Sequence, residues 1–270
     1  PQGEWLITQG YSKMKVLVWS GSCTQTHSSL LIDQVRGVGL LTNGIIIRNL
    51  DRRIQATITG IDYTNSIAIT TPVISWTRGD RWVAWYEGCS NYFPDIYLDT
   101  LTNPEGGLGA LIDPDFYVDY NSIVDSKYFC IANNFFWDGV IDKPIPWLQW
   151  ATRESLGSLL FPSKINGSFA LLPEVQRSPV ALFNASNVYD FVEEFAERQE
   201  LNTVVVTYLD GSDGLFKPTS VTVMTDDAYS GSVQIVEETL QLDSVTNFNQ
   251  AVKIGQVYLK TRLLQDRAIS

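Results

Sequence analysis

The sequence holds one histidine, His27, and three cysteines in 270 residues. A single histidine excludes the catalytic zinc sites that need two or three of them. The cysteines, Cys23, Cys89 and Cys130, are an odd number without Cys-x-x-Cys spacing, which favours reduced thiols that pack as small hydrophobic side chains. We therefore expect no metal and no cofactor.

Basic residues are also scarce. The chain carries 19 lysines and arginines against 30 acidic residues, a formal net charge of −11. Proteins that bind nucleic acid without sequence preference need clustered lysines and arginines for the phosphates, so we expect no specific nucleic-acid binding. Glycine-rich nucleotide motifs are missing too. No apolar run reaches roughly 18 residues, the length that predicts a membrane-spanning helix.

The remaining composition, with 44% hydrophobic residues, is that of a globular protein. Residues 1–88 form short, evenly spaced β segments, which predict a barrel or sandwich domain. Residues 89–180 predict an α+β domain, and residues 181–270 predict another. The expected fold class is α+β, mainly β, with small barrel-like β domains flanking an α+β domain.

Local signals predict several elements. Ile54, Ala56 and Ile58 alternate with polar residues, as in a strand with one wet face. A helix is expected to begin near Pro94 and to stop near Asn103, because the residue before a proline avoids the α region. A second helix is expected after Asn121, with a buried stripe formed by Val124, Tyr128, Ile131 and Phe135. A third helix is expected over 146–160 and a strand over 167–172.

The last region mixes both types of element. A helix capped by Ser186 or Asn187 is expected to continue through Phe195. Strands are predicted over 203–209 and 220–224, paired across the loop 210–214, with a third strand over 233–236 and a closing helix capped by Thr246.

Candidates for catalysis are weak. Asp113, Asp115 and Asp119 lie close in sequence, and glycoside hydrolysis needs two carboxylates. Sequence neighbours rarely act as acid and base across one substrate, so a solvated acidic face is favoured. His27 is the sole histidine that could serve Cys23 as a base, and a loop histidine is favoured there. We expect no catalytic residue.

Two further groups of residues have a structural and a functional interpretation. Asp210 and Asp213 share a glycine-rich loop without the spacing of a calcium loop, which favours a hairpin turn. Trp76, Trp82 and Trp85 crowd one β segment. Core packing is the favoured interpretation, a protein interface is the next, and stacking of sugars is the least favoured.

Residues 95–109 have the sequence DIYLDTLTNPEGGLG. This run resembles the "LTNP…G.G" signature of central tail-tip proteins of long-tailed bacteriophages, the host-specificity (tip attachment, J-like) proteins related to baseplate hubs. In that family a helix ends at the Asn-Pro pair and glycines carry the chain round a tight bend. The resemblance implies that the bend residues here are Leu101, Thr102, Asn103, Pro104, Gly107 and Gly109.

The resemblance continues to the end of the chain and is weaker over residues 1–88. It includes Cys130 near a helix end, LNTVVVTYLD over 201–210 and SVTNFNQA over 244–251. It implies that residues 181–270 are a tail-tube-like hub domain, truncated at its C-terminal end. Because full-length members are longer, and because the sequence starts with Pro1, we expect a segment of a larger protein.

The function that the resemblance implies is structural. The chain would be a virion protein of the distal tail tip, assembled in the host cytoplasm as a homotrimer, without enzymatic activity. As a hub it would close the tail tube and take part in host attachment and DNA ejection. Its partners would be tail tube and distal tail proteins and tail fibre or receptor-binding components, with indirect contact to the host outer surface. The alternative is a carbohydrate-active or glycan-binding module of a phage tail that uses Asp113, Asp115 or Asp119 beside aromatic platforms.

Overall fold

The structure is a computed structural model, and its elements fall into two units. It describes residues 14–24, 26, 30–31, 40–65, 67–105, 107–141, 145–175, 193–195, 201–264 and 267–269. The first unit comprises Pro1–Phe136, Val140–Ser155 and Leu160–Pro173, and the second comprises Trp137–Gly139, Leu156–Leu159 and Glu174–Ser270. Helices and sheets are both present, so the predicted α+β class is confirmed. The division into domains 1–88, 89–180 and 181–270 stays a prediction.

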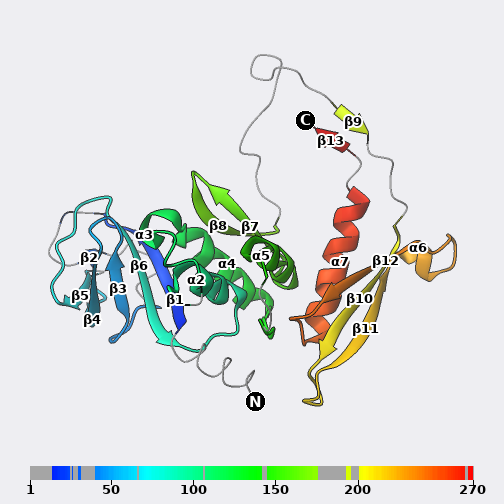
Figure 1. Cartoon of the computed structure of the whole chain (residues 1–270), viewed down its shortest axis with the longest axis horizontal. Helices are drawn as coiled ribbons and strands as arrows, with labels where there is room; N and C mark the ends of the chain where they lie inside the picture. Colours follow the sequence, from blue (N-terminus) through cyan, green and yellow to red (C-terminus); the bar gives the residue numbers. More distant parts are fainter. Residues whose placement is uncertain are drawn as a thin grey trace. The chain divides into compact units, whose positions relative to one another are not determined.

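An antiparallel sheet of six strands, in the order β1-β6-β3-β4-β5-β2, forms the base of the first unit (Figure 1). Its strands are β1 (Met14–Ser22), β2 (Leu30–Leu31), β3 (Ile46–Asn49), β4 (Ile54–Asp62), β5 (Ile67–Thr71) and β6 (Arg81–Gly88). None of the described sheets closes into a barrel. Among the described strands the expected barrel-like closure is therefore absent, and the outer edge of β1 bonds to helix side chains instead.

The core of this sheet lies on the face that carries Ile47, Ile58 and Trp82. The alternation predicted for β4 is confirmed at Ala56 and Ile58, which are buried, whereas Ile54 is exposed. The three clustered tryptophans are also buried, which confirms core packing for Trp76, Trp82 and Trp85.

Helices and a hairpin complete the first unit (Figure 1). They are α2 (Phe93–Thr102), α3 (Pro114–Tyr117), α4 (Tyr120–Asn133), α5 (Trp147–Ser155), β7 (Leu160–Ile165) and β8 (Ser168–Pro173). The start and stop predicted for the first helix are confirmed. The helix expected over 146–160 is shorter, because the chain turns at Leu159, which has a φ of 50°, and Leu160 begins β7. Aromatic rings join α2 to α5, with 5.7 Å between the centroids of Phe93 and Trp150.

The buried face of α4 differs from the predicted stripe. Val124 is buried as expected, but Ile131 is exposed. Phe135 is buried beyond the end of the helix, after the left-handed residue Asn134. The buried face instead runs through Ile123, Lys127 and Cys130, and the ammonium group of Lys127 pairs with a buried carboxylate.

The second unit contains a three-stranded sheet in the order β11-β10-β12 (Figure 1). Its elements are η2 (Leu156–Ser158), β9 (Glu193–Phe195), β10 (Thr203–Asp210), β11 (Lys217–Met224), α6 (Asp226–Tyr229), β12 (Glu237–Leu242), α7 (Phe248–Leu264) and β13 (Arg267–Ile269). The hairpin of β10 and β11 is confirmed, as is the turn interpretation of Asp210 and Asp213, which accept bonds from backbone N–H groups of the loop.

Three predictions in this unit were wrong in detail. The third strand begins at Glu237 and not at residue 233, and it runs parallel to β10. Asn247 caps α7 by accepting from the N–H groups of residues 249 and 250, while the Thr246 hydroxyl donates to Asp138. Residues 193–195 form β9, paired with β13, where a helix was expected. The predicted caps Ser186 and Asn187 lie outside the described residues.

Candidate functional site

The bend predicted at residues 101–109 follows α2. The helix ends at Thr102, and Asn103 is extended, with φ −75° and ψ 120°, as a residue before proline prefers. The N–H of Asn103 still donates to the carbonyl oxygen of Asp99 at 2.8 Å. Leu101 is fully buried and fixes the end of the helix in the core.

The chain then folds back onto the last turn of the helix. The N–H of Leu108 donates to the carbonyl oxygen of Thr100 at 2.7 Å, and the N–H groups of Gly107 and Gly109 both donate to that of Asn103 at 3.1 Å. The side-chain oxygen of Asn103 accepts from the N–H of Glu105 at 2.9 Å. Asn103 therefore organises the bend through its main chain and its side chain, and the carbonyl groups at the helix end gain partners.

Space, and not backbone angle, requires glycine at two positions of the bend. A Cβ atom on Gly107 would lie 2.2 Å from the carbonyl oxygen of Thr100. A Cβ atom on Gly109 would lie 2.3 Å from the carbonyl oxygen of Thr102. Both distances are far below van der Waals contact, so the backbone can approach the helix this closely only where no side chain intervenes.

The start of α2 is held by a buried ion pair that sequence reasoning missed. Asp95 is fully buried, and its carboxylate lies 2.9 Å from the ammonium nitrogen of Lys127. The hydroxyl of Ser90 and the N–H of Leu17 also donate to this carboxylate, at 2.5 and 2.9 Å. Burial raises the pKa of the Asp95 carboxyl above its ordinary value, although Lys127, Ser90 and Leu17 all act to lower it.

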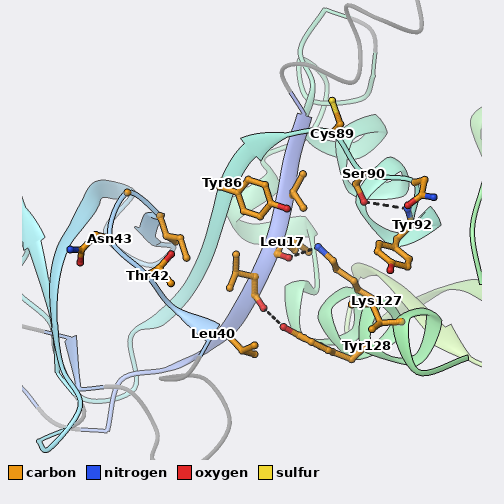
Figure 2. A pocket seen from close by; sticks show the side chains of 16 residues that line it. Leu17, Leu40, Thr42, Asn43, Tyr86, Cys89, Ser90, Tyr92, Lys127 and Tyr128 are labelled. Carbon is orange, nitrogen blue, oxygen red and sulfur yellow. Dashed lines mark hydrogen bonds between the residues drawn. The ribbon is translucent and has the colours of Figure 1, made fainter. Parts of the chain in front are cut away.

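The same group of side chains caps the edge of β1. Lys127 donates to the carbonyl oxygen of Leu17 at 2.5 Å, and the Tyr128 hydroxyl donates to that of Val18 at 2.8 Å. Figure 2 shows both side chains reaching from α4 to β1. They line an open pocket of about 630 Å³. Side chains therefore satisfy backbone groups that an edge strand would otherwise leave open to another strand.

The three aspartates considered for glycan chemistry each bond to a neighbouring structural group. Asp113 caps α3 and pairs with Arg53. Asp115 is buried and accepts two hydrogen bonds from Arg48, at 2.8 and 2.6 Å. Asp119 caps α4 by accepting from the N–H groups of residues 121 and 122, at 3.2 and 3.3 Å. Their carboxylates thus connect the helices α3 and α4 to the chain around them.

We expect Asp119→Ala to lower the free energy of unfolding by about 1 kcal/mol, the usual cost of removing a helix N-cap. Asp119→Asn should stay close to the parent protein, because asparagine caps helices as well as aspartate does. Chemical denaturation measures both values. A carboxylate needed for its charge would instead make the asparagine variant as poor as the alanine variant.

Of the remaining candidate residues, the structure describes the three cysteines. Cys23 and Cys130 are buried, as predicted, whereas the prediction was wrong for Cys89, which is exposed. His27 lies outside the described residues. Within the described ranges, no group of three or more His, Cys, Asp or Glu side chains could hold a metal ion, and no helix has the length and hydropathy to cross a membrane.

Comparison with known proteins gives distant similarity. No protein-family model matches the chain, and none of the curated proteins does. Among solved structures, the chain is similar to the tail protein from Neisseria meningitidis MC58, with a TM-score of 0.33 and 12% identity over 83% of this chain and 73% of that one. It is also similar to the 43 kDa tail protein of prophage MuSo2 from Shewanella oneidensis, with a TM-score of 0.35 and 12% identity over 95% and 76%.

A third similar structure is the virion of a native gene transfer agent particle, with a TM-score of 0.38 and 12% identity over 96% of this chain and 73% of that one. All three structures are therefore tail or virion proteins.

Proposed function

We propose that this chain is a structural protein of a bacteriophage tail, and more specifically the hub of the distal tail tip. One observation carries the proposal. The run that resembles the tail-tip signature folds into a closed bend in which Gly107 and Gly109 are sterically required. Asn103 bonds to the helix end through its N–H group and to the N–H groups of residues 105, 107 and 109 through its oxygen atoms. The residue types that define the resemblance are thus the ones on which this local geometry depends.

The acidic residues support a structural role over a carbohydrate-active one. Asp113 and Asp119 cap helices, and Asp115 holds Arg48 in a half-buried ion pair. A glycosidase needs one carboxyl group free to protonate the leaving group and another free to face the sugar. Carboxylates that already accept bonds from backbone N–H groups or arginine are poorly suited to either task.

In this role the chain assembles as a homotrimer that closes the tail tube and opens for DNA ejection. It contacts tube and distal tail proteins on one side and fibre or receptor-binding components on the other, and reaches the host surface through the latter. It catalyses no reaction. The packed bend and the buried ion pair provide the rigid parts that such an assembly needs.

Antibody labelling of native particles, viewed by electron microscopy, tests the proposal. We expect label confined to the distal end of the tail, with three copies in class averages. As a control, antibody that has first been absorbed with the purified chain should give no label. Label along the tail shaft or on the capsid would contradict the hub. Label only on free soluble protein would contradict any role in the virion.

A further inference from the structure

The second unit exposes three large apolar side chains around the loop of its β10–β11 hairpin (Figure 1). Leu215 and Phe216, in the loop itself, are 64% and 54% exposed, and Phe248, at the start of α7, is 53% exposed. The N–H of Gly211 in the loop donates to the carbonyl oxygen of Thr246 at 3.3 Å, so the loop and the start of α7 lie together. We call these three exposed side chains the apolar tip. Exposed apolar side chains that gather in this way mark interaction sites.

The apolar tip has a fixed shape although one of its residues is strained. Phe216 has a φ of 48°, in the left-handed region that glycine and asparagine adopt far more readily than a bulky residue. The side chain of Asp213 orders the loop by accepting from the N–H of Leu215 at 2.9 Å and from the ammonium group of Lys217 at 3.1 Å. Strain of this kind is typical of functional positions. It points to a role for the exposed ring in contact with another molecule.

The pocket in Figure 2, in the first unit, has a size and a lining that suit such a tip. Its volume of about 630 Å³ lies within the roughly 300–1,000 Å³ of pockets that enclose small molecules. It therefore has room for a leucine and a phenylalanine side chain. Three large apolar residues of its lining are themselves exposed, Leu40 at 39%, Tyr86 at 45% and Ile131 at 38%. Apolar surface is thus left uncovered on both the tip and the pocket.

The charges of the two surfaces are also compatible. The apolar tip is flanked by Asp210 and Asp213 in the loop and by Asp138, which accepts from the hydroxyl of Thr246. The sequence carries 30 acidic residues against 19 basic ones. Among the described residues that line the pocket, however, there is no aspartate or glutamate, and the one charged residue is Lys127. The pocket is therefore a place on an acidic chain that does not repel the acidic flanks of the tip.

We infer that the apolar tip of one copy of this chain inserts into this pocket on a second copy. Tip and pocket are different surfaces, so the contact is head-to-tail, and head-to-tail contacts close into a ring where the rotation between copies allows it. A ring of three copies is the case that the proposed function requires, and the inference rests on that proposed homotrimer. In the contact, Tyr86 and Ile131 of one copy cover Leu215 and Phe216 of the next.

Disulfide formation between copies tests the contact, because the exposed Cys89 lines the pocket whereas Cys23 and Cys130 are buried. Leu215→Cys in the full chain places a second thiol on the tip. After oxidation by air with copper–phenanthroline, we expect covalent dimers and trimers on a non-reducing gel, and Cys89→Ser should abolish them. Tyr229→Cys is the matched control, because Tyr229 is 85% exposed in the same unit but lies in α6. This control should stay monomeric on the gel.

A mixture of variants determines the direction of the contact. Leu215→Cys/Cys89→Ser mixed with the parent chain should give covalent dimers only, because the single disulfide joins one tip to one pocket. The double variant alone should give none. Cross-linking of the double variant with itself would show a tip-to-tip contact and overturn the inference. A disulfide of Leu215→Cys that closes within one chain would overturn it as well.

Phe216→Asn provides a second measurement that a folding defect cannot imitate. Asparagine tolerates a φ of 48°, so we expect the melting temperature of the monomer to be unchanged or higher. Self-association, measured by analytical ultracentrifugation, should weaken by about tenfold or more, as for the loss of an aromatic anchor. The inference is wrong if this variant associates like the parent chain, or if Leu215→Cys gives no covalent dimer.

The outcomes also separate this contact from the role in a phage tail. Three labelled copies at the distal end of the tail, without the cross-link, would support the proposed function and overturn the contact. The cross-link, without label on any particle, would support the contact and contradict the proposed function.

Discussion

Gly107→Ala is expected to lower the free energy of unfolding of the first unit by roughly 3 kcal/mol or more. The added methyl group would lie 2.2 Å from the carbonyl oxygen of Thr100, which is backbone and cannot rotate away. Either the chain after Pro104 moves off the helix or the helix end unwinds. Both lose the hydrogen bonds that close the bend. Denaturant unfolding followed by tryptophan fluorescence measures the change.

Gly60→Ala is the matched control for this prediction. A Cβ atom on Gly60, in β4, would meet the side chain of Ile69 at 3.5 Å, an ordinary contact. Its effect should stay within about 1 kcal/mol. Gly109→Ala should behave like Gly107→Ala, because its Cβ atom would lie 2.3 Å from the carbonyl oxygen of Thr102. If Gly107→Ala is as stable as Gly60→Ala, the bend is looser than described.

Lys127→Met should lower the free energy of unfolding by about 3–5 kcal/mol, the usual effect of removing one partner of a buried ion pair. The carboxylate of Asp95 stays buried without the ammonium group, and the carbonyl oxygen of Leu17 loses a donor. Asp95→Asn/Lys127→Met removes both charges, keeps an oxygen that accepts from the N–H of Leu17, and places an amide nitrogen that can donate to the Ser90 hydroxyl. We expect this double variant to recover about half of the loss. If the double variant is as unstable as Lys127→Met, the fit of the side chains, and not the unpaired charge, determines the loss of stability.

The effect of Lys127→Met should also depend on pH. Burial raises the pKa of the Asp95 carboxyl, and removing Lys127 raises it further, because the ammonium group lowers it. A folded-state pKa above the unfolded one favours the folded state at low pH, and this stability is lost as pH rises from the unfolded pKa through the folded one. The variant should therefore lose less stability at about pH 4 than at about pH 8. A loss independent of pH would contradict the raised pKa.

Short-range patterns in the sequence determined much of this protein. Asn103-Pro104 ends α2 because proline restricts the residue before it, and β-branched residues produce the β10–β11 hairpin. Alternation places Ala56 and Ile58 in the core. The resemblance at residues 95–109 located the bend. Each of these signals is a pattern within one continuous segment of the chain, which is why sequence reasoning could find it.

The tertiary structure alone decided the long-range contacts. Lys127 pairs with Asp95, 32 residues away, so the buried face of α4 includes a charged residue that the predicted apolar stripe did not contain. The Ser20 hydroxyl of β1 donates to the side-chain oxygen of Asn121 in α4, 101 residues away. Asp113, Asp115 and Asp119 resembled a reactive cluster in sequence, yet folding gives each a different partner. Burial and partner choice depend on packing between distant segments, and no local pattern encodes them.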